Sequence, residues 1–98
     1  MVTGTLEAAT DAALADAARQ TGLGRHELKV IRAEHVTWRN GSLGCPEKGM
    51  VYTDALVPGF RIQIQAESRV LDYHGSTRGL PMLCPAERAV EPLPSDAV

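Results

Sequence analysis

Aromatic residues are scarce in this sequence, which has one tryptophan, one phenylalanine and two tyrosines among its 98 residues. A chain of this length forms one domain with a modest core, and that core must be mainly aliphatic. No apolar run approaches the roughly 18 to 20 residues that span a bilayer, so we expect no membrane partner. A basic cluster is also missing, and the net charge of −2 argues against a nucleic-acid partner.

An export signal is absent as well. The first ten residues, MVTGTLEAAT, have neither the basic start nor the apolar block of a signal peptide. We therefore expect a cytoplasmic protein as written. A periplasmic or secreted location is expected instead if the chain is a mature form whose two cysteines are bonded.

Cysteine occurs only twice, as Cys45 and Cys84, and several kinds of chemistry stay open for the pair. We favour a disulfide between them, which would close a loop of about 40 residues and stabilise the fold by roughly 4 kcal/mol in the chain-entropy model. Two buried thiols are the next interpretation. A zinc site with His35 and His74 is disfavoured, because these residues lack the short paired spacing of zinc ligands and both histidines are expected to face solvent. We expect no metal and no cofactor.

Cys45 could also act as a nucleophile, with His74 or His35 as the base and Asp54 or Asp72 as the acid. Pro46 argues against this, because it removes the backbone N–H that usually serves as an oxyanion donor just after a nucleophile. We therefore expect no catalytic residues. A thiol- or metal-dependent small enzyme centred on Cys45 is kept as the alternative function.

The segment from Thr5 to Thr21 favours helix at nearly every position, and Gly22 is placed to end it. Its apolar positions form a stripe of mostly small side chains that suits close packing on a sheet. These positions are Leu6, Ala9, Ala13, Leu14 and Ala17.

Segments with strand character follow the helix. Leu28 to Trp38 is rich in β-branched residues, and its blurred alternation predicts a bulge near Ala33 and Glu34. In LVPGFRIQIQAE, the side chains of Phe60, Ile62 and Ile64 alternate with those of Arg61, Gln63 and Gln65, which predicts a strand with one wet face. Val57-Pro58-Gly59 predicts a type II turn before that strand. RVLDYH follows a tight turn at Glu67 and Ser68, and LPMLC is a possible short edge strand.

Helix first and strands after predict an α+β fold, with one N-terminal helix packed on a three- or four-stranded, mainly antiparallel sheet. We place a single domain at residues 1–85. Residues 86–98 are rich in proline and small residues and are predicted to be a disordered tail. The sequence predicts no oligomeric state.

The stretch VTWRNGSLGCPEKGMVYTD carries most of the unusual backbone residues. Asn40-Gly41 suits a turn with positive φ at both positions, and Gly44 and Gly49 allow further reversals. The stretch is either an ordered crossover that buries Leu43, Met50 and Tyr52, or a rigid surface presented to a partner. The candidate binding residues are Trp38, Asn40, Ser42, Leu43, Met50 and Tyr52.

The motifs in VTWRNGSLGCPEKGMVYTDALVPGFRI, followed by DYHG and a final cysteine, resemble a group of small bacterial proteins and domains. The shared pattern is Trp, Asp or Asn, Gly-Ser-Leu-Gly-Cys-Pro, then Met-x-Tyr-Thr, and Val-Pro-Gly with an aromatic residue. The resemblance implies kinship and no particular activity, because no function is established for the group. Members of the group often look exported.

These observations predict a small non-enzymatic interaction module. Its loop from Trp38 to Asp54 would contact a protein partner, in the manner of an inhibitor or an adaptor.

Overall fold

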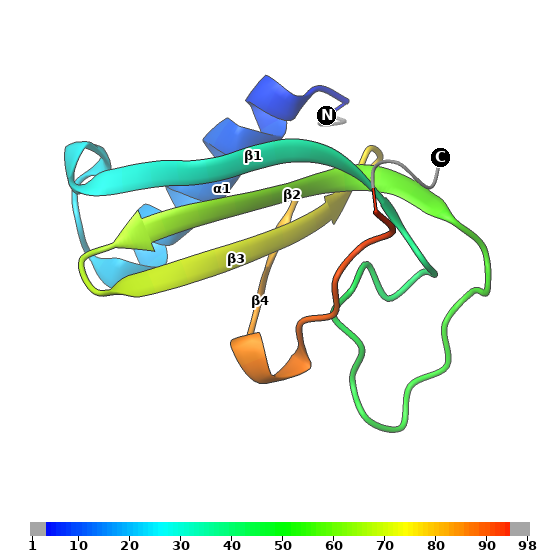
Figure 1. Cartoon of the computed structure of the whole chain (residues 1–98). Helices are drawn as coiled ribbons and strands as arrows, with labels where there is room; N and C mark the ends of the chain where they lie inside the picture. The colour runs from blue at the N-terminus through cyan, green and yellow to red at the C-terminus, as the bar shows by residue number, and fades with distance from the viewer. Residues whose placement is uncertain (1–3, 95–98) are drawn as a thin grey trace.

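The computed structural model describes residues 4–94, in which one α-helix packs on a four-stranded antiparallel sheet (Figure 1). The strands lie in the sheet in their sequence order. The α+β fold predicted from the sequence is confirmed, with four strands. Between residues 4 and 94, no helix is long and apolar enough to cross a membrane. The elements are α1 (Leu6–Thr21), β1 (Leu28–Trp38), β2 (Val57–Ala66), β3 (Arg69–Ser76) and β4 (Met82–Cys84), with short 3-10 helices at Arg25–Glu27 and Ala86–Arg88.

Local chemistry fixes both ends of α1. The Thr5 side chain accepts a hydrogen bond from the Ala8 N–H at 3.1 Å, and Gly22 ends the helix with a φ of 76°. The face between these caps is built from small residues. Ala9, Ala13 and Ala17 are fully buried against the sheet, as the apolar stripe predicts, so the helix backbone approaches the strands closely.

The main core lies between α1 and the sheet. Phe60, Ile62 and Ile64 of β2 meet Leu71 and Tyr73 of β3 there, and all five side chains are at most 3% exposed. The face predicted for β2 is therefore correct. β2 and β3 are joined by the predicted two-residue turn, which leaves Glu67 with a positive φ of 58°.

Two details of the strands differ from the sequence-based expectation. The register shift in β1 lies between Val30 and Arg32, earlier than the predicted bulge. The segment Val57-Pro58-Gly59 forms the first three residues of β2 and pairs with the end of β1, so the predicted type II turn is wrong. Gly59 is held between two neighbouring strands, and this pairing overrides the local turn preference.

Residues 89–94, called the strap below, also differ from the expected disordered tail. The Val90 N–H donates to the Gly44 carbonyl at 2.8 Å, and the Leu93 N–H donates to the Thr37 carbonyl at 3.0 Å. Proline prevents regular secondary structure in this segment, but it does not prevent such single backbone hydrogen bonds to other parts of the chain. The last four residues of the predicted tail lie outside the described residues.

Arg61 lies on the face of β2 that was predicted to be wet, and it is only 5% exposed. Its guanidinium contacts Glu34 of β1 at 3.1 Å and Glu91 of the strap at 2.8 Å. Burial alone would lower the pKa of Arg61, but the hydrogen bonds and charges of these two carboxylates outweigh it and raise the pKa. Arg61 is thus held inside as a paired charge.

Tyr73 links the sheet to the helix and supplies a first testable prediction. Its hydroxyl donates to Asp16 Oδ2 at 2.8 Å. Burial is the larger cause and this hydrogen bond the second cause that raise the pKa of Tyr73 well above the usual value. At neutral pH, Tyr73→Phe should lower the free energy of unfolding by about 1–2 kcal/mol, as measured by urea denaturation.

The same pair gives a pH dependence. The raised pKa of Tyr73 stabilises the folded state in full below about pH 10, which is the pKa of a tyrosine in the unfolded chain. Above that pH the stabilisation is progressively lost, because the tyrosine ionises in the unfolded chain more readily than in the folded protein. The stability gap between the wild type and Tyr73→Phe should therefore narrow above about pH 10. A gap that stays constant with pH would contradict this account.

Candidate functional site

The connection between β1 and β2, residues 39–56, has two parts with different surroundings. Residues 39–45 pack on the face of the sheet opposite α1, called the outer face below. Residues 46–56 project beyond the sheet, as the green loop in Figure 1 shows. The first part forms a second small core, and the second part forms an exposed surface.

Trp38 is the centre of the second core, with no exposed surface. Its indole N–H donates to the Gly75 carbonyl at 3.0 Å, and its ring stacks on His74 with a centroid separation of 4.4 Å. To reach His74, the indole passes over Gly59. A Cβ on Gly59 would lie 2.9 Å from Trp38 Nε1 and would collide with the Gly75 carbonyl oxygen. The position therefore requires glycine for close packing.

His74 is buried, so the prediction that it faces solvent is wrong. Its Nδ1 lies 2.7 Å from the Leu43 carbonyl oxygen, and its Nε2 lies 2.9 Å from Asp72 Oδ2. Both partners are hydrogen-bond acceptors. The two contacts hold the imidazole ring between the Leu43 carbonyl and the Asp72 carboxylate. His74 ties the loop to β3, whereas His35 is exposed as predicted and lies beside Phe60, with ring centroids 5.2 Å apart.

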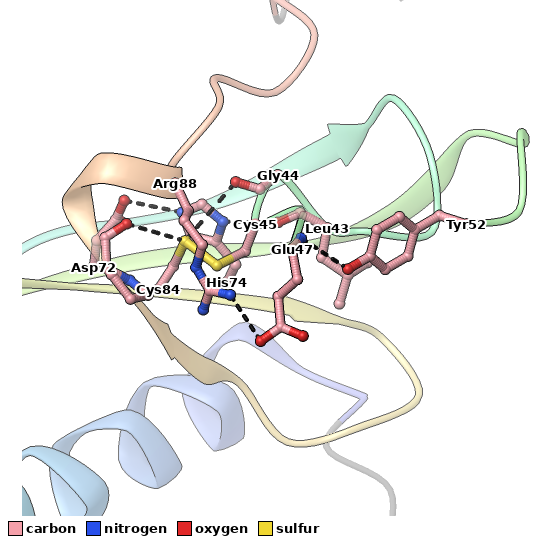
Figure 2. The surroundings of a disulfide bond; sticks show 10 residues. Leu43, Gly44, Cys45, Glu47, Tyr52, Asp72, His74, Cys84 and Arg88 are labelled. Atoms are coloured by element: carbon pink, nitrogen blue, oxygen red, sulfur yellow. Dashed lines mark hydrogen bonds and ion pairs between the residues drawn. A yellow bond between two sulfur atoms is a disulfide. The ribbon is translucent and has the colours of Figure 1, made fainter. Parts of the chain in front are cut away.

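A disulfide joins Cys45 to Cys84 and pins the loop to β4 next to His74 and Asp72 (Figure 2). The two Cα atoms are 5.8 Å apart and the residues are 39 positions apart in the sequence. Both sulfur atoms are used in this bond, so neither cysteine offers a thiol to a nucleophilic or a zinc site. Between residues 4 and 94, no group of three or more histidine, cysteine, aspartate or glutamate side chains is arranged to hold a metal ion.

The turn before the disulfide is not the one that the sequence predicts. Asn40 and Gly41 do not adopt positive φ; instead Leu43 and Gly44 do, at 56° and 69°. The Asn40 side chain accepts hydrogen bonds from the backbone N–H and the hydroxyl of Ser42, at 2.9 and 2.6 Å. Gly44 lies against Trp38, whose ring a Cβ would overlap. This turn directs the Leu43 carbonyl toward His74.

The projecting residues 46–56 are held by hydrogen bonds and one ion pair. The Tyr52 hydroxyl accepts from the Glu47 N–H at 3.0 Å, and the Thr53 carbonyl accepts from the Gly41 N–H at 2.9 Å. Glu47 also pairs with Arg88 at 2.8 Å (Figure 2). These contacts fix a loop that contains no helix or strand.

Three apolar side chains point into solvent from this loop: Met50 is 58% exposed, Val51 94% and Leu56 62%. Of the six candidate binding residues, only Met50 is exposed. Trp38 and Ser42 are buried, while Asn40, Leu43 and Tyr52 are half-buried and support the loop. Sequence reasoning missed Val51 and Leu56, because an apolar residue in a loop gives no periodic signal of the side it faces.

Comparison with known proteins adds a family. A family model described as a domain of unknown function, DUF8738, matches residues 10–84. The chain belongs to the DUF8738 family. No curated protein and no solved structure matches it. The region matched to DUF8738 contains Trp38, His74 and both cysteines, and it ends before the strap.

The disulfide gives a second prediction. Replacing both cysteines, as Cys45→Ala with Cys84→Ala, should lower the free energy of unfolding by about 2–4 kcal/mol in urea denaturation. Adding a reductant should destabilise the wild type but not the double variant. Equal stability of the reduced and oxidised wild type would show that the bond does not stabilise the fold.

Gly59→Ala gives a third prediction. The new methyl group must displace the Trp38 indole or the Gly75 carbonyl, so the free energy of unfolding should fall by about 1–3 kcal/mol. Tryptophan fluorescence should move to longer wavelength as the indole meets water. Gly4→Ala is the matched control, because a Cβ there has no neighbour within 4 Å; equal effects of the two substitutions would refute the packing argument.

Proposed function

We propose that this DUF8738 domain is a non-enzymatic binding module that contacts another protein through residues 46–56. The observation that carries the proposal is the exposure of Met50, Val51 and Leu56 on a loop held in place by hydrogen bonds, an ion pair and a disulfide. Single exposed apolar residues are ordinary on protein surfaces. Three of them on one fixed loop present a small apolar surface to a partner.

The way the loop is held supports binding for a second reason. Association costs free energy when loops must be ordered, and a preorganised loop avoids much of that cost. The disulfide at Cys45 and the ion pair between Glu47 and Arg88 hold the first half of the projecting loop, and the hydrogen bond to Thr53 holds the second half. Met50 and Val51 lie between these attachments. Their exposed surface is available without a prior rearrangement.

The surroundings of Cys45 and His74 favour binding over catalysis. Cys45 is bonded to Cys84, and both ring nitrogens of His74 already contact acceptors beneath the Trp38 ring. The alternative, a thiol enzyme centred on Cys45, needs the bond to be reduced and the histidine to be released. The disulfide also favours an oxidising compartment, so we propose a periplasmic or extracellular location.

The test uses a photoreactive amino acid, such as benzoylphenylalanine, at position 51. The labelled protein is irradiated with proteins of the proposed compartment, and the same label at Val70, which is 53% exposed on β3, serves as the control site. An adduct is expected from position 51 and not from position 70. Excess unlabelled wild type should suppress the adduct, whereas excess Val51→Asp should not.

Val51→Asp should leave the free energy of unfolding within about 0.5 kcal/mol of the wild type, because Val51 is almost fully exposed. Failure of the variant to compete then reports on binding and not on folding. Suppression by Val51→Asp as effective as that by the wild type, or equal adducts from both label positions, would refute the loop as the contact surface.

A further inference from the structure

A groove of about 810 Å³ runs beside β1, between the end of that strand and the strap. Its lining is rich in charge for so small a site, because Arg32, Arg39, Arg61, Glu34 and Glu91 all contribute to it. Apolar walls come from Val36, Pro92 and Leu93. The groove is a different surface from the exposed tip of the loop at Met50 and Val51.

The charges in the groove leave a positive surplus. Three arginines meet two glutamates there, although the whole chain has a net charge of −2. Glu34 is shared between Arg61, at 3.1 Å, and Arg32, at 3.7 Å. Arg39 makes no ion pair with any other residue between 4 and 94 and lies exposed at the groove. The groove is therefore an attractive site for an anion in an otherwise acidic protein.

The strap shows what kind of segment fits beside the groove. It places a carboxylate, Glu91, 2.8 Å from the guanidinium of Arg61, and two residues later the Leu93 N–H donates to the edge of β1. A segment without regular structure thus places a carboxylate on Arg61 and a backbone N–H on β1, two of the contacts that a peptide makes when it binds at the edge of a sheet. The Glu91 side chain is 80% exposed, so a carboxylate of a bound ligand can replace it beside Arg61 at little cost in free energy.

We propose that this groove binds an extended acidic segment of a partner protein. Carboxylates of that segment pair with Arg39 and Arg32 and compete with Glu91 for Arg61, while apolar residues between them contact Val36 and Leu93. The proposal does not depend on the loop tip and stands if the contact through Val51 fails.

The test measures fluorescence anisotropy of a labelled peptide, Leu-Glu-Pro-Leu-Glu-Pro-Leu-Glu, titrated with the full chain. Its counterpart has glutamine in place of every glutamate. The acidic peptide should bind, and its affinity should fall as salt is added, whereas the glutamine peptide should not bind. Arg39→Gln should weaken binding roughly three- to tenfold through the loss of one charged contact. Arg69→Gln is the matched control, because it removes the same charge from an exposed residue outside the groove.

Glu91→Gln gives the most specific expectation. It removes the competing carboxylate, so the acidic peptide should bind roughly two- to fivefold more tightly than to the wild type. The proposal is overturned if the glutamine peptide binds equally well, if Arg69→Gln weakens binding as much as Arg39→Gln, or if Glu91→Gln weakens it. The proposal is also overturned if heparin binds more tightly than the peptide and its binding depends on Arg39, because the groove would then be a general polyanion site.

Discussion

The indole of Trp38, laid across Gly59 and stacked on His74, is the contact on which the outer face of this protein depends. It requires a residue without a side chain at position 59, and it leaves room for only a glycine at position 44. The positive φ angles of Leu43 and Gly44 then bring the Leu43 carbonyl to His74. Without the indole, residues 39–45 would lose the apolar surface on which they pack, and only hydrogen bonds, one ion pair and the disulfide would hold the loop.

A sheet with one helix usually leaves its second face to water. Here residues 39–45 and the strap cover the part of the second face around Trp38, Arg61 and His74, while Gln65 and Val70 further along that face stay exposed. The chain uses its few aromatic residues accordingly. Phe60 and Tyr73 fill the core under α1, and Trp38 fills the core on the other side. The cover has an electrostatic consequence, because Arg61 is enclosed by it. A buried guanidinium is tolerated only with hydrogen-bonded counter-charges, and Glu34 and Glu91 provide them.

Sequence patterns correctly predicted the features that neighbouring residues determine. Helix propensity and Gly22 predicted α1 to within one residue, from Thr5 to Thr21, and strict alternation predicted the inward face of β2. Two of the errors concern contacts between distant parts of the chain, because the burial of His74 and the order of the strap arise from groups far apart in the sequence. The disulfide between Cys45 and Cys84, which the sequence favours over free thiols, is confirmed. At the loop, the sequence located the unusual segment and Met50, but burial of Trp38 and exposure of Val51 depend on which side the folded loop presents.

The strap links the two surfaces proposed for binding. It lies outside the region matched to the DUF8738 family, yet its backbone holds Gly44, and Arg88, just before it, holds Glu47 of the projecting loop. The same short segment supplies Glu91 to the arginine groove. A ligand that displaces Glu91 therefore disturbs the residue next to Val90, whose backbone N–H donates to the Gly44 carbonyl. If such a ligand moves the strap, it changes the free energy with which the strap holds the loop. Because coupling free energies are reciprocal, the order of the loop then changes the affinity of the groove for the ligand by the same amount.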